Sequence, residues 1–320
     1  MSAADGWEGY WRSTREAAAH KAGGPQDEVL ARFWTGFFES TLPNYPYPRL
    51  LDVGCGNGAV VRFVFDTAKH LGIAQPSVYG LDRSSAALTE FHKRFPSSSG
   101  IVADARQMPF GDGVFDLVAS QFGVEYAGID AIGHAARLVA PNGVLAAILH
   151  LKNGAIFREC AINLEAMTGV RDNDLLARAK QVFRTGMAAN TARGSKAAFR
   201  RADAKFATAV AKVEDILRNK GNDVTGGVVH ELYIDIAHMY GRMSAYSLRE
   251  VSDWIDQMAV EMELYIGRMS SMLKAAIDET ELDRMLQLLG AQGLRVRVRE
   301  TMHMGERAEA AAWALVCDRR

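Results

Sequence analysis

Residues 50–58 read LLDVGCGNG and place three glycines directly after a short apolar run. Glycine suits such a point because the backbone turns sharply there and a ligand can approach where a Cβ atom would collide. The sequence GCGNGA at residues 54–59 also fits the fingerprint of dinucleotide-binding loops, and an ordinary glycine turn gives a similar pattern. The segment therefore predicts a strand-to-helix turn, and the residues that follow decide its ligand.

Short apolar runs alternate with helical stretches from residue 49 to about residue 151. Strict alternation of strand and helix predicts a parallel sheet covered on both faces. The five strand candidates are RLLDVG, SVYGLD, GIVADA, FDLVASQ and GVLAAILHL.

The sheet resumes near the carboxyl terminus. A helix is predicted over residues 281–289, followed by the alternating run LRVRVRETM at 294–302 and the apolar run AAWALVC at 311–317. Alternation with arginine is typical of a half-exposed edge strand, and a continuous apolar run is typical of a strand buried on both faces. We expect the two to form a closing hairpin.

Two further parts of the chain have helical character. Residues 1–41 carry aromatic residues spaced for one buried face, with an interruption at Gly23-Gly24-Pro25, and three prolines in residues 43–48 end the helix. Between about residues 155 and 277 the strand signal is lost and apolar residues recur at helical spacing. We therefore divide the chain into an N-terminal helical extension (1–48), an α/β core (49–154 and 278–320) and a helical insertion (155–277).

The composition limits the class of protein. The chain has 320 residues, 48% apolar and 23% charged, and a net charge of -1, which argues against a surface built for nucleic acid or anionic lipid. Three scattered cysteines give neither a disulfide framework nor metal-ligand spacing. Because the N-terminal sequence has no apolar signal region and no apolar run is long enough for a membrane span, we expect a cytoplasmic protein without a metal site.

Acidic residues end the second and third strand candidates. Asp82 can accept hydrogen bonds from a ribose diol, and Asp104 can accept from an adenine amino group, because open sheets bind ligands at the carboxyl ends of their strands. Asp82 lies 30 residues after Asp52. The acid that contacts a nicotinamide ribose is expected after roughly 20 residues, so this spacing disfavours a dehydrogenase.

Five motifs follow one another along the core: DVGCGNG (52–58), GLD (80–82), DARQMPF (104–110), FDLV (115–118) and LVAPNGVL (138–145). Together they resemble the successive motifs of class I S-adenosylmethionine-dependent methyltransferases. The resemblance covers about residues 49–151 and the hairpin at 280–318, and leaves out the helical insertion. It implies a Rossmann-like α/β fold with a seven-stranded, mostly parallel sheet whose last strand is antiparallel.

The resemblance also implies a donor site for S-adenosylmethionine, with S-adenosylhomocysteine as product. It implies that the glycines line the methionine moiety and that Asp52 lies near the donor's ammonium or holds the loop. It also implies that Asp82 binds the ribose. Asp104 and a backbone amide would bind the adenine ring, which lies between two side chains. Residues 120–122 face donor and acceptor. The implied donor-binding residues are Asp52, Gly54, Gly56, Gly58, Asp82, Arg83, Asp104, Ala105, Met108 and Gln121.

The acceptor side matches the family less closely. Where many relatives carry a histidine after the fourth strand, this chain has QFGVEY at 121–126. Glu125 and His150 follow the ends of central strands and are the candidate bases, with a capping carboxylate and a structural histidine as the alternatives. Candidate acceptor contacts are Phe122, Tyr126, Tyr265, Arg268 and Met269, although a methionine stripe is also typical of a helical core.

Tyr10 and Trp11 either close over the donor, as helical extensions do in relatives, or pack in the core. Residues 171–220 hold 12 basic and 5 acidic residues, and residues 221–290 hold 5 and 12, a division that two complementary helical layers explain. The sequence thus predicts methyl transfer to a small-molecule oxygen or nitrogen acceptor enclosed by the insertion as a lid, without a nucleic acid partner. An RNA or protein methyltransferase and a non-catalytic donor-binding module are the alternatives, and the oligomeric state is left open.

Overall fold

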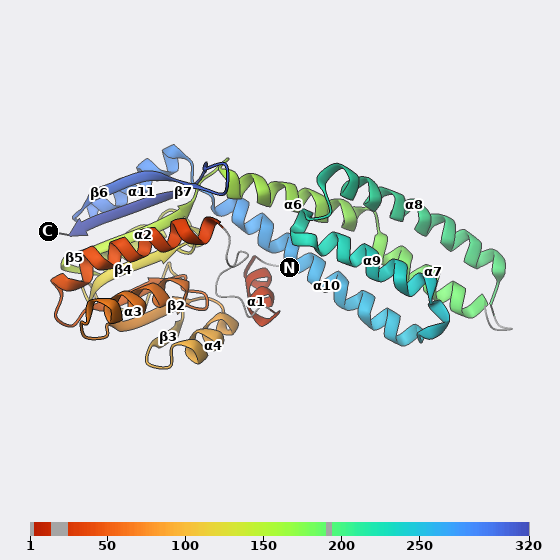
Figure 1. The fold of residues 1–320 in the computed structure, drawn as a ribbon, viewed down its shortest axis with the longest axis horizontal. Coiled ribbons are helices and arrows are strands. Elements are labelled where there is room, and N and C mark those ends of the chain that lie inside the picture. Colours follow the sequence, from red (N-terminus) through yellow and green to blue (C-terminus); the bar gives the residue numbers. More distant parts are fainter. Residues whose placement is uncertain (1–2, 14–24, 190–193, 320) are drawn as a thin grey trace. The chain divides into compact units, whose positions relative to one another are not determined.

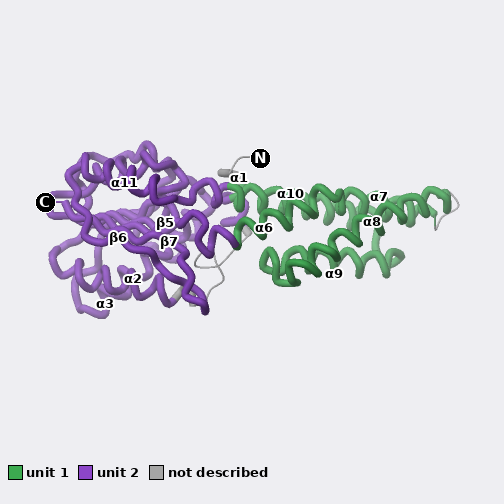
Figure 2. The backbone as a smooth tube through the Cα atoms, turned by 90° about the horizontal axis from the view of Figure 1, so that it is seen from above, with its two compact units in different colours: residues 1–6, 159–270 green, residues 7–158, 271–320 purple. Residues whose placement is uncertain are grey.

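The computed structural model describes residues 3–13, 25–189 and 194–319. The chain divides into two compact units: a sheet-containing unit of residues 7–158 and 271–320, and a helical unit of residues 1–6 and 159–270 (Figure 2). Because the two are separate units, each is described by itself.

The sheet-containing unit is built on one seven-stranded sheet of order β3-β2-β1-β4-β5-β7-β6. Strands β1 to β5 are parallel, while β7 runs antiparallel to both β5 and β6. This confirms the predicted fold class, with its antiparallel last strand and closing hairpin. The strands are β1 (Arg49–Val53), β2 (Ser77–Asp82), β3 (Ser99–Val102), β4 (Phe115–Gln121), β5 (Val139–His150), β6 (Leu294–Met304) and β7 (Glu309–Arg319).

Helices cover the sheet and also supply the N-terminal segment (Figure 1). The predicted interruption at Gly23 and Gly24 lies outside the described residues, and the second helix begins at Pro25, where a proline costs no helical hydrogen bond. The helices of this part are α1 (Ala3–Ser13), α2 (Pro25–Thr41), α3 (Ala59–Leu71), α4 (Ser85–Arg94), α5 (Ala131–Arg137) and α11 (Glu279–Ala291), with 3-10 turns η1 (Leu42–Asn44) and η2 (Val124–Ala127).

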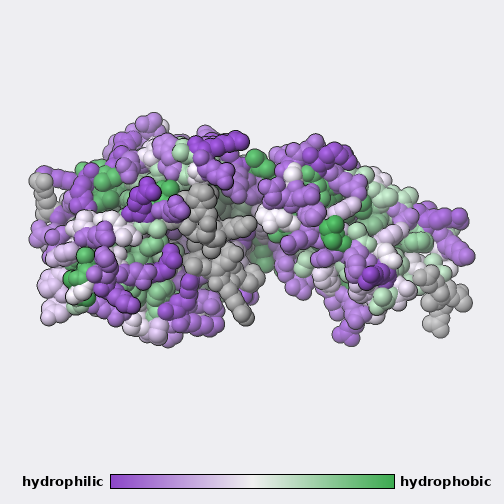
Figure 3. All heavy atoms as spheres, viewed as in Figure 1, coloured by the Kyte–Doolittle hydropathy of each residue, from purple (hydrophilic) through white to green (hydrophobic). Residues whose placement is uncertain are grey.

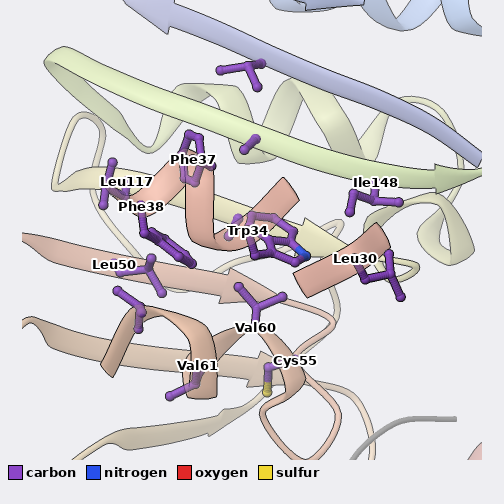
Figure 4. Packing of buried hydrophobic residues seen from close by; sticks show 14 of the residues in the cluster. Leu30, Trp34, Phe37, Phe38, Leu50, Cys55, Val60, Val61, Leu117 and Ile148 are labelled. Atoms are coloured by element: carbon purple, nitrogen blue, oxygen red, sulfur yellow. The ribbon is translucent and has the colours of Figure 1, made fainter. Parts of the chain in front are cut away.

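Side-chain alternation along the strands builds two cores, one on each face of the sheet. Leu50 and Leu117 point to the face covered by α2 and α3, whereas their neighbours Leu51 and Val118 point to the face covered by α5 and α11. Figure 4 shows Phe38 of α2 beside Leu50 and Leu117, and Trp34 of the same helix beside Val60, in the first of these cores. Because both faces are apolar, ligand-binding side chains are left to the ends of the strands.

The helical unit has its own apolar core, formed by the inward faces of α6 to α10. Ion pairs between helices join lysines of the basic segment 171–220 to acidic residues outside it: Lys180 binds Asp256 and Lys220 binds Glu165. The elements of this segment are α6 (Ala155–Asp172), α7 (Leu175–Ala189), α8 (Lys196–Lys220), η3 (Val224–Gly227), α9 (Val228–Gly241), η4 (Met243–Ala245) and α10 (Leu248–Ala275).

Hydrophilic residues occupy much of the face shown in Figure 3, with apolar residues scattered among them. Among the residues that the structure describes, no helix combines the length and the apolar composition needed to cross a membrane.

Candidate active site

The carboxyl edge of the parallel strands collects the residues expected to bind a donor. Strand β1 lies between β2 and β4, so the strand order reverses there, and open α/β sheets bind ligands at such a point. The loop after β1, Asp82 at the end of β2 and Gln121 and His150 at the ends of β4 and β5 all lie at this edge.

Backbone conformation and close packing both require glycine in the loop after β1. Gly54 and Gly56 have φ of +69° and +52°, a conformation that disfavours residues with a Cβ atom. A Cβ atom on Gly54 would stand 2.6 Å from Cα of Gly123, and one on Gly56 would stand 2.7 Å from the indole ring of Trp11. The sequence suggested that a ligand requires these glycines, and the structure adds that the β4 loop and α1 approach the same positions.

Asp82 connects the glycine loop to the start of α4. One of its carboxylate oxygens accepts a hydrogen bond from the amide of Gly56 and the other from the amide of Ser84, both at 2.8 Å. The side chain is half-buried, and burial raises its pKa while the amides act in the opposite direction. Each oxygen keeps a second lone pair, so the carboxylate can still accept from two hydroxyl groups.

Asp52 is the least satisfied polar group of the site. It is 1% exposed, and both of its carboxylate oxygens lack a hydrogen-bond partner among the described residues. Burial and the nearby charge of Asp82 raise its pKa to about 8. Such a group is costly to leave unpaired, and a cationic ligand group would satisfy it. The observation fits a donor that carries an ammonium.

Asp104 has a partner that the sequence did not identify. Arg106 donates to one oxygen from Nε at 3.0 Å and to the other from Nη2 at 2.6 Å. This forked pair lowers the pKa of Asp104 to about 2. An adenine amino group would therefore bind to a carboxylate that is already oriented by an arginine.

The other residues predicted around the adenine differ in exposure. Met108 is buried and packs in the core beneath α5, Ala105 packs partly buried against the same core, and Arg83 is exposed. Their donor contacts remain a prediction.

Glu125 and His150, predicted as bases from separate strand ends, are brought together. Oε1 of Glu125 lies 2.9 Å from Nδ1 of His150 and accepts from the backbone amide of His150 at 3.2 Å. The side chains are 0% and 7% exposed, respectively. A carboxylate only accepts hydrogen bonds, so in neutral His150 the hydrogen sits on Nδ1 and Nε2 is left as an acceptor. Oε2 of Glu125 has no hydrogen-bond partner among the described residues.

Ser120 holds the short η2 turn, which carries Glu125, against the end of β1. Its hydroxyl donates to the carbonyl of Val53 at 2.7 Å and accepts from the amide of Val124 at 2.9 Å. This side chain joins the end of β1 to the turn that carries the glutamate.

Aromatic rings fix the orientation of the imidazole. The ring centroid of Phe122 lies 4.3 Å from that of His150, and Tyr126 meets the same ring edge-on at 5.7 Å. Phe122 has φ of +51°, a conformation that is unfavourable for a phenylalanine. Such strain is concentrated at functional sites, where the surrounding structure maintains it.

The N-terminal helix reaches the same edge. Trp7 meets Tyr126 edge-on at 5.5 Å, and Trp11 is buried with its indole against Gly56. Glu8 accepts hydrogen bonds from the hydroxyls of Ser84, at 2.6 Å, and Ser85, at 3.1 Å. Trp11 packs against the glycine loop, and both alternatives for Tyr10 and Trp11, closure over the donor and core packing, remain predictions.

Gln121 has a fixed amide orientation. Nε1 of Trp34 donates to Oε1 of Gln121 at 2.6 Å, and the indole of Trp34 is fully buried. An indole N–H can only donate, so the amide oxygen faces it and the amide N–H groups point elsewhere. The periodicity of α2 indicated a buried Trp34, but no sequence signal pointed to this hydrogen bond.

The three candidate acceptor contacts from the insertion lie on α10. Met269 is buried, and the guanidinium of Arg268 lies 5.1 Å from the ring centroid of Tyr265. Burial raises the pKa of Tyr265 to about 12. Their acceptor contacts remain a prediction. In the described ranges, no group of three or more histidine, cysteine, aspartate or glutamate residues could hold a metal ion.

Comparison with known proteins finds relatives of part of the sheet-containing unit. Residues 51–147 match the family model described as a methyltransferase domain. A malonyl-[acyl-carrier protein] O-methyltransferase from Enterobacter lignolyticus is 32% identical over 123 residues, 38% of this chain and 46% of that protein. A demethylmenaquinone methyltransferase from Thermotoga maritima is 39% identical over 75 residues, 23% of this chain and 31% of that protein. The chain therefore spans less than half the length of these curated relatives.

Among solved structures, the trans-methyltransferase CalH in complex with SAH aligns with a TM-score of 0.45 and 12% identity. That alignment covers 91% of this chain and 59% of that one.

Proposed function

We propose that this chain, which carries a class I S-adenosylmethionine-dependent methyltransferase domain in residues 51–147, transfers a methyl group to a small-molecule acceptor. The observation that carries the proposal is the buried Glu125–His150 pair at the edge of the sheet where Asp52, Asp82 and the glycine loop also lie. The relatives described above are named for malonyl-[acyl-carrier protein] and demethylmenaquinone, and these names support an organic acceptor group rather than RNA.

On the donor side, each acidic residue contacts a different group of the donor. Asp82 binds the ribose hydroxyls with the lone pairs that its amide contacts leave free, and Asp52 faces the ammonium. Asp104, held by Arg106, receives the adenine amino group. When bound, the donor supplies a methyl group bonded to a positively charged sulfur. An acceptor atom that attacks this methyl group displaces the sulfur directly, so alignment of the two reactants and exclusion of water contribute much of the rate acceleration.

On the acceptor side, His150 takes a proton from the attacking atom. Nε2 is its free acceptor, and Glu125 holds the tautomer and stabilises the positive charge that forms on the ring. Phe122 and Tyr126 limit the rotation of that ring. This arrangement suits an acceptor whose proton must be removed, a hydroxyl above all.

The helical insertion sets the choice of acceptor in this proposal. It leaves the sheet shortly after His150, since α6 begins at Ala155. In this proposal Tyr265, Arg268 and Met269 contact the acceptor, and Tyr10 and Trp11 close over the donor. Alanine at Tyr265 or Arg268 should change the ranking of acceptors while leaving affinity for S-adenosylhomocysteine within about twofold of the parent, a difference of roughly 0.4 kcal/mol.

The test is turnover by the full chain. Labelled S-adenosylmethionine is incubated with hydroxyl, carboxyl and amine acceptors, and transfer is compared between the parent and His150→Ala. The proposal expects transfer to at least one small molecule that the substitution slows. Affinity for S-adenosylhomocysteine without transfer to any small acceptor, accompanied by transfer to RNA or protein, would contradict it.

A further inference from the structure

Asp52 lies on β1 with its Cα paired to Gly80 of β2 on one side and to Ala119 of β4 on the other. Both strands are central, and the carboxyl group is buried between them without a hydrogen-bond partner in the described residues. The ionisable group that acts on it electrostatically is Asp82, an acid, and Asp52 in turn helps to raise the pKa of the neighbouring Cys55 thiol, a second acid. No positive charge is provided for Asp52 by these neighbours.

The protonation state of Asp52 therefore depends on the ligand. Burial penalises the charged form, and the charge of Asp82 adds repulsion, so the pKa of about 8 keeps Asp52 largely protonated at neutral pH in the free protein. An ammonium placed beside Asp52 offsets both the burial and the repulsion that raise its pKa, because an opposite charge at short range favours the carboxylate.

We propose that Asp52 gives up its proton when the donor's ammonium binds, so that binding of the donor releases one proton to the solvent. The inference rests on the proposed function and adds the release of a proton to binding at its donor site. The proton leaves the carboxyl oxygen of Asp52 for a buffer base, the ammonium keeps its own protons, and a buried carboxylate–ammonium pair remains. No bond to carbon or sulfur changes.

The exchange makes donor affinity depend on pH. Below the pKa of the free protein's Asp52, affinity rises about tenfold per pH unit, because one proton is released for each ligand bound. Above about pH 8 the carboxyl group is already ionised, and the dependence disappears. A ligand that lacks the ammonium should show neither behaviour.

The experiment is titration calorimetry of the full chain at about pH 6.5, well below the pKa of Asp52, in two buffers of different ionisation enthalpy. The probes are S-adenosylhomocysteine, which carries the ammonium, and 5′-methylthioadenosine, which lacks it. We expect release of close to one proton with the first probe and none with the second. Asp52→Asn should abolish the release, whereas Cys55→Ala, the control for the nearby thiol, should retain it.

The outcomes separate the two proposals. If S-adenosylhomocysteine binds the parent without releasing a proton, or if Asp52→Asn releases as many protons as the parent, the proposed proton release is wrong. The proposed donor site is unaffected by either result. If neither probe binds, the proposed function fails and the exchange with it. Affinity of the parent for S-adenosylhomocysteine between about pH 5.5 and 9 repeats the test without any variant, and a flat profile would also overturn the exchange.

Discussion

The carboxylate of Glu125 lies 2.9 Å from Nδ1 of His150, although the two residues are 25 positions apart in the chain. Parallel pairing of β4 with β5 brings His150, the last residue of β5, close to Glu125 in the turn that follows β4. The pair is buried, and with Nδ1 held by Glu125 the ring has Nε2 left as its hydrogen-bond acceptor.

Replacing His150 by alanine should slow methyl transfer to a hydroxyl acceptor by roughly 10² to 10⁴-fold, because a positioned base is lost. Affinity for S-adenosylhomocysteine should be nearly unchanged. Single-turnover transfer across about pH 6 to 9 measures the rate, with His134→Ala on the exposed face of α5 as the control.

Glu125→Gln keeps an oxygen for Nδ1 but removes the charge, so it should slow the same reaction less than loss of the ring does. Parental rates at every pH in both variants would remove the pair from the mechanism and leave alignment and water exclusion. Slowing confined to an already neutral amine acceptor would contradict the role of His150 as a base.

Asp82→Asn should weaken binding of S-adenosylhomocysteine by about 1 to 3 kcal/mol, the usual cost of removing a charged acceptor from buried hydroxyls. Calorimetry measures the change, and Asp66→Asn on the exposed side of α3 is the matched control. An unchanged affinity in a folded Asp82 variant would show that another residue binds the ribose.

The hydrogen bond between Trp34 and Gln121 can be tested by a double-mutant cycle. Trp34→Phe keeps a ring but removes the donor, and Gln121→Met removes the acceptor while keeping the length of the side chain. We expect the two changes in unfolding free energy, measured with denaturant, to be coupled by about 0.5 to 1.5 kcal/mol. Strictly additive effects would mean that the hydrogen bond does not stabilise the fold.

Asp52 should make the free protein less stable as pH rises. Its folded-state pKa, raised to about 8, exceeds the ordinary value of 3.8, so the folded chain binds more protons than the unfolded chain between these values. The free energy of unfolding contributed by this residue therefore falls from about pH 4 to pH 8.

Asp52→Asn removes that dependence and should stabilise the free protein by an amount on the order of a few kcal/mol at pH 8. The difference in unfolding free energy between parent and variant, measured at about pH 5 and pH 8, isolates the residue from the other carboxyl groups. A difference that is the same at both values would contradict a buried, unpaired Asp52.

The local sequence was enough to predict the sheet because its strands have distinctive patterns. Apolar runs such as FDLVASQ end at residues that strand pairing must bring to one edge, and the arginines of β6 alternate as an edge strand requires. The capping box of Asp278 and Glu281 fixes the start of α11, a signal present in the sequence that the predicted helix of residues 281–289 did not use.

Contacts between distant segments could not be predicted in the same way. The partner of Gln121 comes from α2, the indole on Gly56 comes from α1, and the arginine on Asp104 occupies a position with no constraint from periodicity. Each depends on how a side chain packs across the fold, which strand and helix patterns do not encode. For the same reason Glu125 and His150 were predicted as separate candidates, and their hydrogen bond was found only in the structure.

A crystal structure of the full chain with S-adenosylhomocysteine tests the central claim most directly. The account predicts the ribose hydroxyls on Asp82, the ammonium against Asp52, and the sulfur facing a cavity that Nε2 of His150 borders. A ligand bound away from the carboxyl ends of β1 and β2, or one whose sulfur faces away from His150, would contradict it.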